Sequence, residues 1–146
     1  MTIQDRGLSS AVELELLIFT VGGIAMAVDT AQVEEMLRPA EAERREVETR
    51  MFHENLFSGE RASSYSEPMV LMIREGPPYG IVVDRPDEIT KVPLQRIQPL
   101  PALIEKHALS KAVWGIALKD DKMIMLVDFY QLPVMEAMKI KPKIRQ

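Results

Sequence analysis

Residues 79–93 read YGIVVDRPDEITKVP, which joins a short apolar run to a Val-Asp pair and two prolines. Isoleucine and valine favour buried strands, so residues 79–83 are predicted to form one. Pro86 has no backbone N–H to donate to a sheet, and it restricts the conformation of Arg85. The sequence therefore predicts that the strand stops near Asp84, turns sharply, and is followed by a second strand.

The same pattern occurs earlier in the chain. Residues 25–29 read AMAVD and residues 80–84 read GIVVD, so the apolar positions and the Val-Asp pairs coincide. Another strand-like segment follows each Val-Asp pair, and a proline ends each of these segments, Pro39 in the first copy and Pro93 in the second. This repeat predicts that the fold consists of two related halves.

Segments typical of strands recur at hairpin spacing along the rest of the chain. They lie at residues 12–21, 32–38, 68–74, 112–118 and 123–127. Between them, seven of the ten residues 41–50 are charged, which indicates a solvated loop or surface helix, with a short strand at its end and a helical turn at 52–57. About nine short strands with two or three short helices favour an all-β fold of small barrels or a sandwich.

Length and composition exclude several classes of protein. The 146 residues suit a single domain, residues 1–146, with a core large enough to need no disulfide or metal. The chain contains no cysteine, so thiolate metal sites and cysteine nucleophiles are excluded. A net charge of −4 gives no reason to expect nucleic-acid binding. The longest nearly apolar run, residues 16–28, is too short to cross a bilayer, so we expect a cytoplasmic protein without membrane insertion.

Residues that could carry chemistry are few. His53 and His107 have no ligand spacing and are expected at the surface. Asp29, Asp84 and Asp128 each follow a strand, where Asp usually accepts hydrogen bonds from nearby backbone amides.

No nucleophile, base and orienting acid can be assembled from these residues, and no glycine-rich loop could cradle a phosphate. Trp114, the single tryptophan, lies in the apolar run AVWGIAL and is expected in the core. The sequence thus predicts no enzyme, no cofactor and no metal site. A small-ligand protein would need a polar pocket that no motif indicates.

Four stretches together resemble the CheW-like domain, the coupling adaptor of bacterial chemotaxis arrays. They are LLIFTVGGIAMAVDTAQVEEMLRP (16–39), PMVLMIREGPPYGIVVDRPDEITKVP (68–93), IQPLPALIE (97–105) and VWGIALKDDKMIMLVDFYQL (113–132). The resemblance implies two interleaved, five-stranded SH3-like barrels around a shared core. It also implies a non-catalytic scaffold that links the regulatory domain of a CheA-like histidine kinase to the cytoplasmic tips of chemoreceptors.

The resemblance fails after the third strand. Members of the family carry a longer loop there, a strand with an Asn-x-Arg-Gly pattern, and then another strand, whereas residues 40–57 alone fill this interval. The first barrel is therefore expected to be incomplete. We assign it approximately residues 12–66 plus part of the C-terminal segment, and the second approximately residues 67–127. A missing strand would leave an open sheet edge that invites pairing with a second copy.

The resemblance places the partner-binding candidates on the third strand and its counterpart. They are Val33, Glu35 and Ile89. The alternative is that Val33 and Ile89 belong to the core and that Glu35 is merely solvated. The alternative function is a divergent CheW-like domain that self-associates, or regulates another signalling system, without bridging receptor and kinase.

Overall fold

The computed structural model describes residues 12–55, 65–100 and 111–132. These residues form nine strands, one short α-helix and four 3₁₀ turns, so the predicted all-β fold is confirmed. The strands are β1 (Glu13–Val21), β2 (Ile24–Asp29), β3 (Val33–Leu37), β4 (Thr49–Met51), β5 (Pro68–Ile73), β6 (Gly80–Pro93), β7 (Ile97–Gln98), β8 (Val113–Lys119) and β9 (Lys122–Val127). The helix is α2 (Pro39–Arg44), and the 3₁₀ turns are η1 (Thr30–Gln32), η2 (Phe52–Asn55), η3 (Leu94–Arg96) and η4 (Phe129–Gln131). The helical pieces expected after Pro101 and at 134–139 lie outside the described residues.

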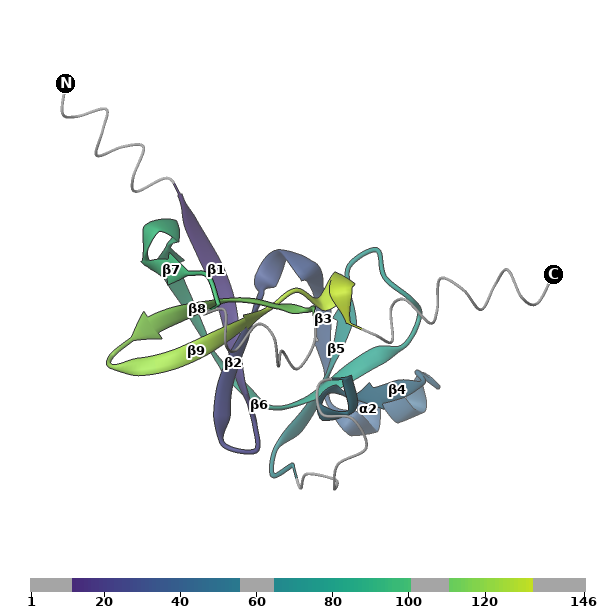
Figure 1. Cartoon of the computed structure of the whole chain (residues 1–146). Coiled ribbons are helices and arrows are strands. Elements are labelled where there is room, and N and C mark those ends of the chain that lie inside the picture. The colour runs from purple at the N-terminus through teal and green to yellow at the C-terminus, as the bar shows by residue number, and fades with distance from the viewer. Residues whose placement is uncertain (1–11, 56–64, 101–110, 133–146) are drawn as a thin grey trace.

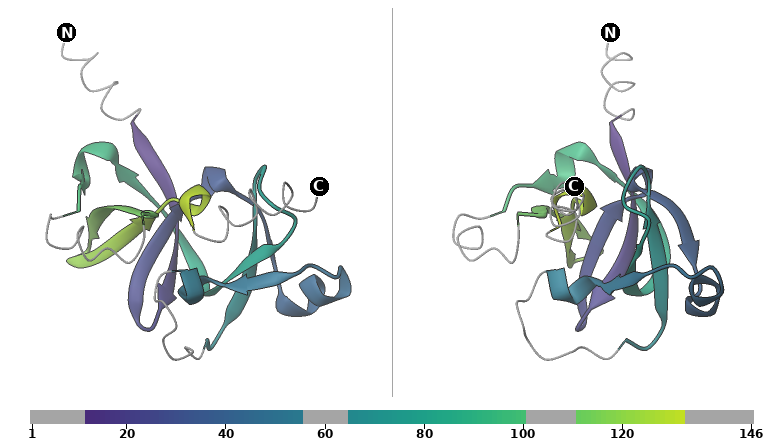
Figure 2. Two further views of the ribbon diagram at one scale, coloured as in Figure 1. Left: turned by 45° about the vertical axis from the view of Figure 1, so that its right-hand side comes forward. Right: turned by 90° about the vertical axis from the view of Figure 1, so that its right-hand side faces the viewer.

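The strands form one continuous sheet in the order β3-β5-β6-β1-β2-β9-β8-β7, with β4 paired to β6 off this path. We call β3, β5, β4 and the first part of β6 the smaller half, and the last part of β6 with β1, β2, β9, β8 and β7 the larger half. In Figure 1 the larger half lies at the left and the smaller half, with α2, at the right. The long strand β6 connects the two (Figure 2).

The two halves repeat each other, as the duplicated Val-Asp pattern predicts. β2 follows β1 in an antiparallel hairpin and pairs in parallel with β9, while the first part of β6 follows β5 in a hairpin and pairs in parallel with β4. The next strand of each half then crosses to the other half: β3 pairs with β5, and the last part of β6 pairs with β1. The halves are therefore interleaved.

The predicted break at Pro86 is wrong, because β6 runs through it as one strand. Asp84 pairs with Pro68 on β5 and with Thr20 on β1. The register between β6 and β1 shifts at this point, so β6 has a bulge and bends where it passes from one half to the other. Arg85 makes the bend with a φ of 54°. A proline inside a bulge removes no ladder hydrogen bond, which is why Pro86 does not end the strand.

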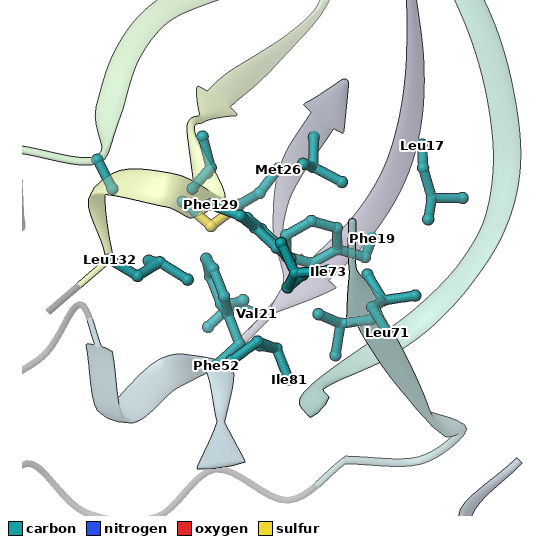
Figure 3. Close-up of a cluster of buried hydrophobic side chains, with 14 of the residues drawn as sticks. Leu17, Phe19, Val21, Met26, Phe52, Leu71, Ile73, Ile81, Phe129 and Leu132 are labelled. Carbon is teal, nitrogen blue, oxygen red and sulfur yellow. The ribbon is translucent and has the colours of Figure 1, made fainter. Parts of the chain in front are cut away.

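The largest apolar cluster fills the space between the halves (Figure 3), and its centre is a group of three phenylalanine rings. Phe19 comes from β1, Phe52 from η2 and Phe129 from η4, and all three are fully buried. Phe19 meets Phe52 edge-on at 5.0 Å between ring centroids, and Phe52 stacks on Phe129 at 5.7 Å. Such offset and edge-on pairs add to the free energy gained from burial.

Each half also has a smaller apolar cluster of its own. That of the larger half contains Leu16, Ala27, Val92, Ala117, Ile124 and Leu126. That of the smaller half contains Leu37, Ala42, Val70 and Val82, with Val47, Met51, Tyr65 and Met72 packed against it. The charged segment contributes α2 and β4 to this smaller half, as expected of a surface helix followed by a short strand.

Two expectations about individual side chains are wrong. His53 is buried, with 5% of its surface exposed, because its ring packs against Tyr65 and its Nδ1 lies 3.0 Å from the Tyr65 hydroxyl. Trp114 is 42% exposed, because the register between β8 and β9 shifts between Val113 and Gly115. His107 lies outside the described residues.

Replacing Phe52 with alanine should destabilise the protein by about 3–5 kcal/mol, since it removes two ring contacts and leaves a cavity beside Phe19 and Phe129. The free energy of unfolding from urea denaturation measures this loss. Met123→Ala, at a side chain 57% exposed on β9, is the control and should cost less than about 1 kcal/mol. Equal losses for the two variants would contradict the central role of the ring cluster.

Candidate functional site

The predicted partner-binding residues lie on two faces of the sheet. Val33 packs against the central cluster, and its register partner Ile73 belongs to that cluster. Ile89 pairs with Leu17, another member of the cluster, and directly paired residues present their side chains on one face. Val33 and Ile89 therefore border the same cluster, Val33 from β3 and Ile89 from β6.

Ile89 is 60% exposed, so it is a surface residue and not part of the core. Val33 is half-buried. The structure thus places an exposed apolar side chain beside the central cluster, where it can contact a partner.

Glu35 faces the opposite way. A register shift between Val33 and Glu35 makes Glu35 pair with Met72, which packs against the cluster of the smaller half. Its carboxylate accepts hydrogen bonds from Arg45 at 3.0 and 3.3 Å. The hydrogen bond from the Arg45 guanidinium lowers the pKa of the Glu35 carboxyl below its ordinary value. Glu35 is therefore bound to its own chain in the structure.

Met36, and not Glu35, lies on the face of β3 that carries Val33 and that is expected to contact a partner. It pairs with Leu71 of the central cluster, and 44% of its surface is exposed. Simple alternation from Val33 would put residues 33, 35 and 37 on one face. The register shift in β3 inverts that order, so no local pattern in the sequence identifies Met36. We call Val33, Met36 and Ile89 the apolar border.

A network of hydrogen bonds fixes the start of β3. Gln32 Nε2 donates to Asp128 Oδ1 at 2.9 Å, and the backbone N–H of Phe129 donates to Gln32 Oε1 at 2.8 Å. Arg74 Nε donates to the carbonyl oxygen of Ala31, and its Nη2 donates to that of Val33, both at 3.0 Å. We call the side chains of Gln32, Arg74 and Asp128 the clasp. The clasp ties the start of β3 to the end of β5 and to η4.

Asp29 and Asp128 accept hydrogen bonds from nearby backbone amides, as predicted. For Asp84 the prediction is wrong, because Asp84 lies inside β6 and bonds a distant amide. Asp29 accepts from the amide of Ala31 and Asp128 from that of Tyr130, which are local turns. Asp84 is buried and accepts from the amide of Glu67, 17 residues away, at 2.8 Å. These carboxylates stabilise the corners of the fold.

Within the described ranges, no three His, Cys, Asp or Glu side chains gather closely enough to hold a metal ion. No helix in the same part of the chain is long and apolar enough to cross a membrane.

Gln32→Ala should destabilise the protein by about 1–3 kcal/mol, because it leaves the Phe129 amide and one Asp128 oxygen without this partner. Urea denaturation measures the change, and faster exchange of the Phe129 amide hydrogen would locate it. Gln131→Ala is the matched control, because Gln131 is exposed and its change should have no measurable effect. If Gln32→Ala is as stable as this control, the clasp does not stabilise the fold.

Comparison with known proteins agrees with this architecture. The sequence profile of the CheW-like domain matches residues 52–134, more than half of the chain. Among solved structures, the scaffolding protein TtCheW from Thermoanaerobacter tengcongensis superimposes with a TM-score of 0.61 and 19% identity, over 80% of this chain and 84% of that one. At 19% identity, this structural similarity shows that the two chains share a fold. No curated protein sequence matches the chain. On the profile match, the chain belongs to the CheW-like domain family.

Proposed function

We propose that the protein is a non-catalytic scaffold that couples a CheA-like histidine kinase to the cytoplasmic tips of chemoreceptors through protein–protein contacts. Membership of the CheW-like family supports a chemotaxis-type scaffold in general. The observation that carries the finer proposal is the exposure of Ile89 beside the buried Leu17. We place the protein in the cytoplasm, where both partners would meet it.

The apolar border suits a partner interface. Its three side chains belong to β3 and β6. Val33 packs against the central cluster, and Met36 and Ile89 pair with the cluster members Leu71 and Leu17. Apolar side chains that stay exposed beside a rigid core gain free energy when a partner covers them. Glu35 faces away from this border, so we retain it as a candidate contact, with Val33 and Ile89, only for a partner that reaches around the end strand β3 and replaces Arg45 with a basic group of its own.

Ile89→Asp should weaken binding to the regulatory domain of the kinase, or to the receptor tip, at least about tenfold without unfolding the protein. Val33→Asp should do the same, although its half-buried side chain makes some loss of stability expected as well. Calorimetric titration with each purified partner measures the affinities, and circular dichroism checks the fold.

Leu118→Asp on β8 is the matched control, because Leu118 is 54% exposed and belongs to neither of the two strands that carry the apolar border. It should bind as the wild type does. The proposal fails if the wild-type protein binds neither partner at about 100 μM, or if Ile89→Asp binds as tightly as Leu118→Asp.

Self-association is a second candidate function, and the smaller half of the sheet favours it. An apolar hollow of about 520 Å³ lies between α2, β4 and β5 and is lined by Val47, Met51, Val70 and Val82 among others. An apolar segment of a second copy could fill this hollow, and strand pairing along the same half would extend the contact. Static light scattering distinguishes the two functions, since a monomer at about 1 mM excludes a functional homodimer.

A further inference from the structure

A second hollow of about 280 Å³ opens on the larger half, and none of its lining residues belongs to the apolar border. Three segments meet there: the β1–β2 hairpin, the bulge of β6 and the turn between β8 and β9. Ile18, Ala25 and Ile124 give it an apolar lining. Charged side chains of the bulge and of the turn surround this lining.

Some charged side chains around the hollow form ion pairs and others do not. Lys119 Nζ lies 3.2 Å from Glu88 Oε2 and 3.2 Å from Asp120 Oδ2, so one ammonium group holds two carboxylates. These carboxylates, Asp120 first and Glu88 second, raise the pKa of Lys119. Arg85 and Lys122 also line the hollow, and neither side chain has an ion-pair partner among the residues that the structure describes.

The backbone of Arg85 is a second observation. Its φ of 54° lies in the left-handed region, which glycine adopts freely and arginine does not. Four other described non-glycine residues share this region, among them Asp120 and Asp121 in the turn between β8 and β9. Such positions occur in turns and at ligand clamps. The bulge directs a long cationic side chain to the rim of the hollow at a position where glycine would suit the backbone better.

The geometry points to a binding site for a small monocarboxylate with a short branched apolar tail. Among the residues that line the hollow, three are cationic (Arg85, Lys119 and Lys122) and two are carboxylates, and both carboxylates are paired with Lys119. A carboxylate can accept two hydrogen bonds from the Arg85 guanidinium, while its tail covers Ile18 and Ile124. A doubly charged phosphate fits less well, because Glu88 and Asp120 would repel its second charge.

The volume agrees with a ligand of this size. Pockets for drug-sized ligands begin at about 300 Å³, so a hollow of 280 Å³ suits a ligand of fewer atoms. Two sources supply such a group: a free branched-chain carboxylic acid, and the terminal carboxylate of a peptide that ends in leucine or valine. The site is separate from the apolar border, so this inference does not depend on the proposed scaffold function.

Isovalerate is the probe for the free acid, and N-acetylated Gly-Gly-Leu is the probe for a peptide terminus. We expect isovalerate to shift the amide NMR signals of Thr20, Arg85 and Lys122 in a saturable way at millimolar concentration. Isoamyl alcohol, which has the same tail without the charge, and inorganic phosphate should not shift these signals. Tighter binding of the peptide than of isovalerate, with loss of binding when its terminus is amidated, would assign the site to peptide termini. Tighter binding of isovalerate than of the peptide would assign the site to free acids.

Arg85→Gly separates binding from folding. Glycine accepts the left-handed backbone, so the variant should be at least as stable as the wild type in thermal denaturation, yet bind isovalerate at least about fivefold more weakly. Lys122→Gln should also weaken binding. Lys91→Gln is the matched control, because Lys91 is an exposed lysine of β6 outside the hollow and its loss should leave the affinity unchanged. No saturable shift with either probe, an equal response to isoamyl alcohol, or unchanged binding by Arg85→Gly would overturn the proposal.

Discussion

The contact among Phe19, Phe52 and Phe129 is the constraint on which the two halves of the fold depend. Phe52 enters from the smaller half, Phe129 follows the last strand of the larger half, and Phe19 lies on the strand between them. Phe52 contacts both rings of the larger half, so the group joins the two halves. Because β3 and β6 also cross between the halves, neither half can close its core without the other. The chain should therefore unfold as one cooperative unit, although its sequence contains a repeat.

The sequence predicts most of the strands because their signals are local. β5, β8 and β9 are apolar runs between turn residues, and the repeated Val-Asp pattern predicts that the fold consists of two related halves. The same reasoning misplaces the end of the strand that contains Pro86. Proline cannot occupy a strand position whose N–H must donate a ladder hydrogen bond. The register of β1 against β6 decides which positions of β6 these are, and Pro86 is not one of them. That register depends on a strand about 70 positions away, so no local pattern records it.

In the candidate site, too, a local sequence pattern cannot predict features that depend on strand register. Val33 and Ile89 are identified through the resemblance to the CheW-like domain, which implies partner contacts on the third strand and its counterpart. In the structure Val33 packs against the central cluster, and Ile89 pairs with Leu17 of that cluster. The faces of Glu35 and Met36 could not be predicted, because one extra residue in β3 reverses the alternation after Val33. The exposure of Trp114 has the same cause in β8. Bulges decide which side chains reach the surface, and a bulge depends on the partner strand as much as on its own residues.

The clasp pre-orders part of the apolar border, on which the proposed scaffold function depends. Arg74 bonds the carbonyl of Val33, and Gln32 bonds the segment that follows β9, so the start of β3 is held from both halves. A partner that covers Val33, Met36 and Ile89 therefore meets a surface whose backbone is already ordered. Ordering a loose segment on binding would consume part of the free energy gained from burial. A pre-ordered border avoids that loss, and it leaves the small apolar area free to contribute to affinity.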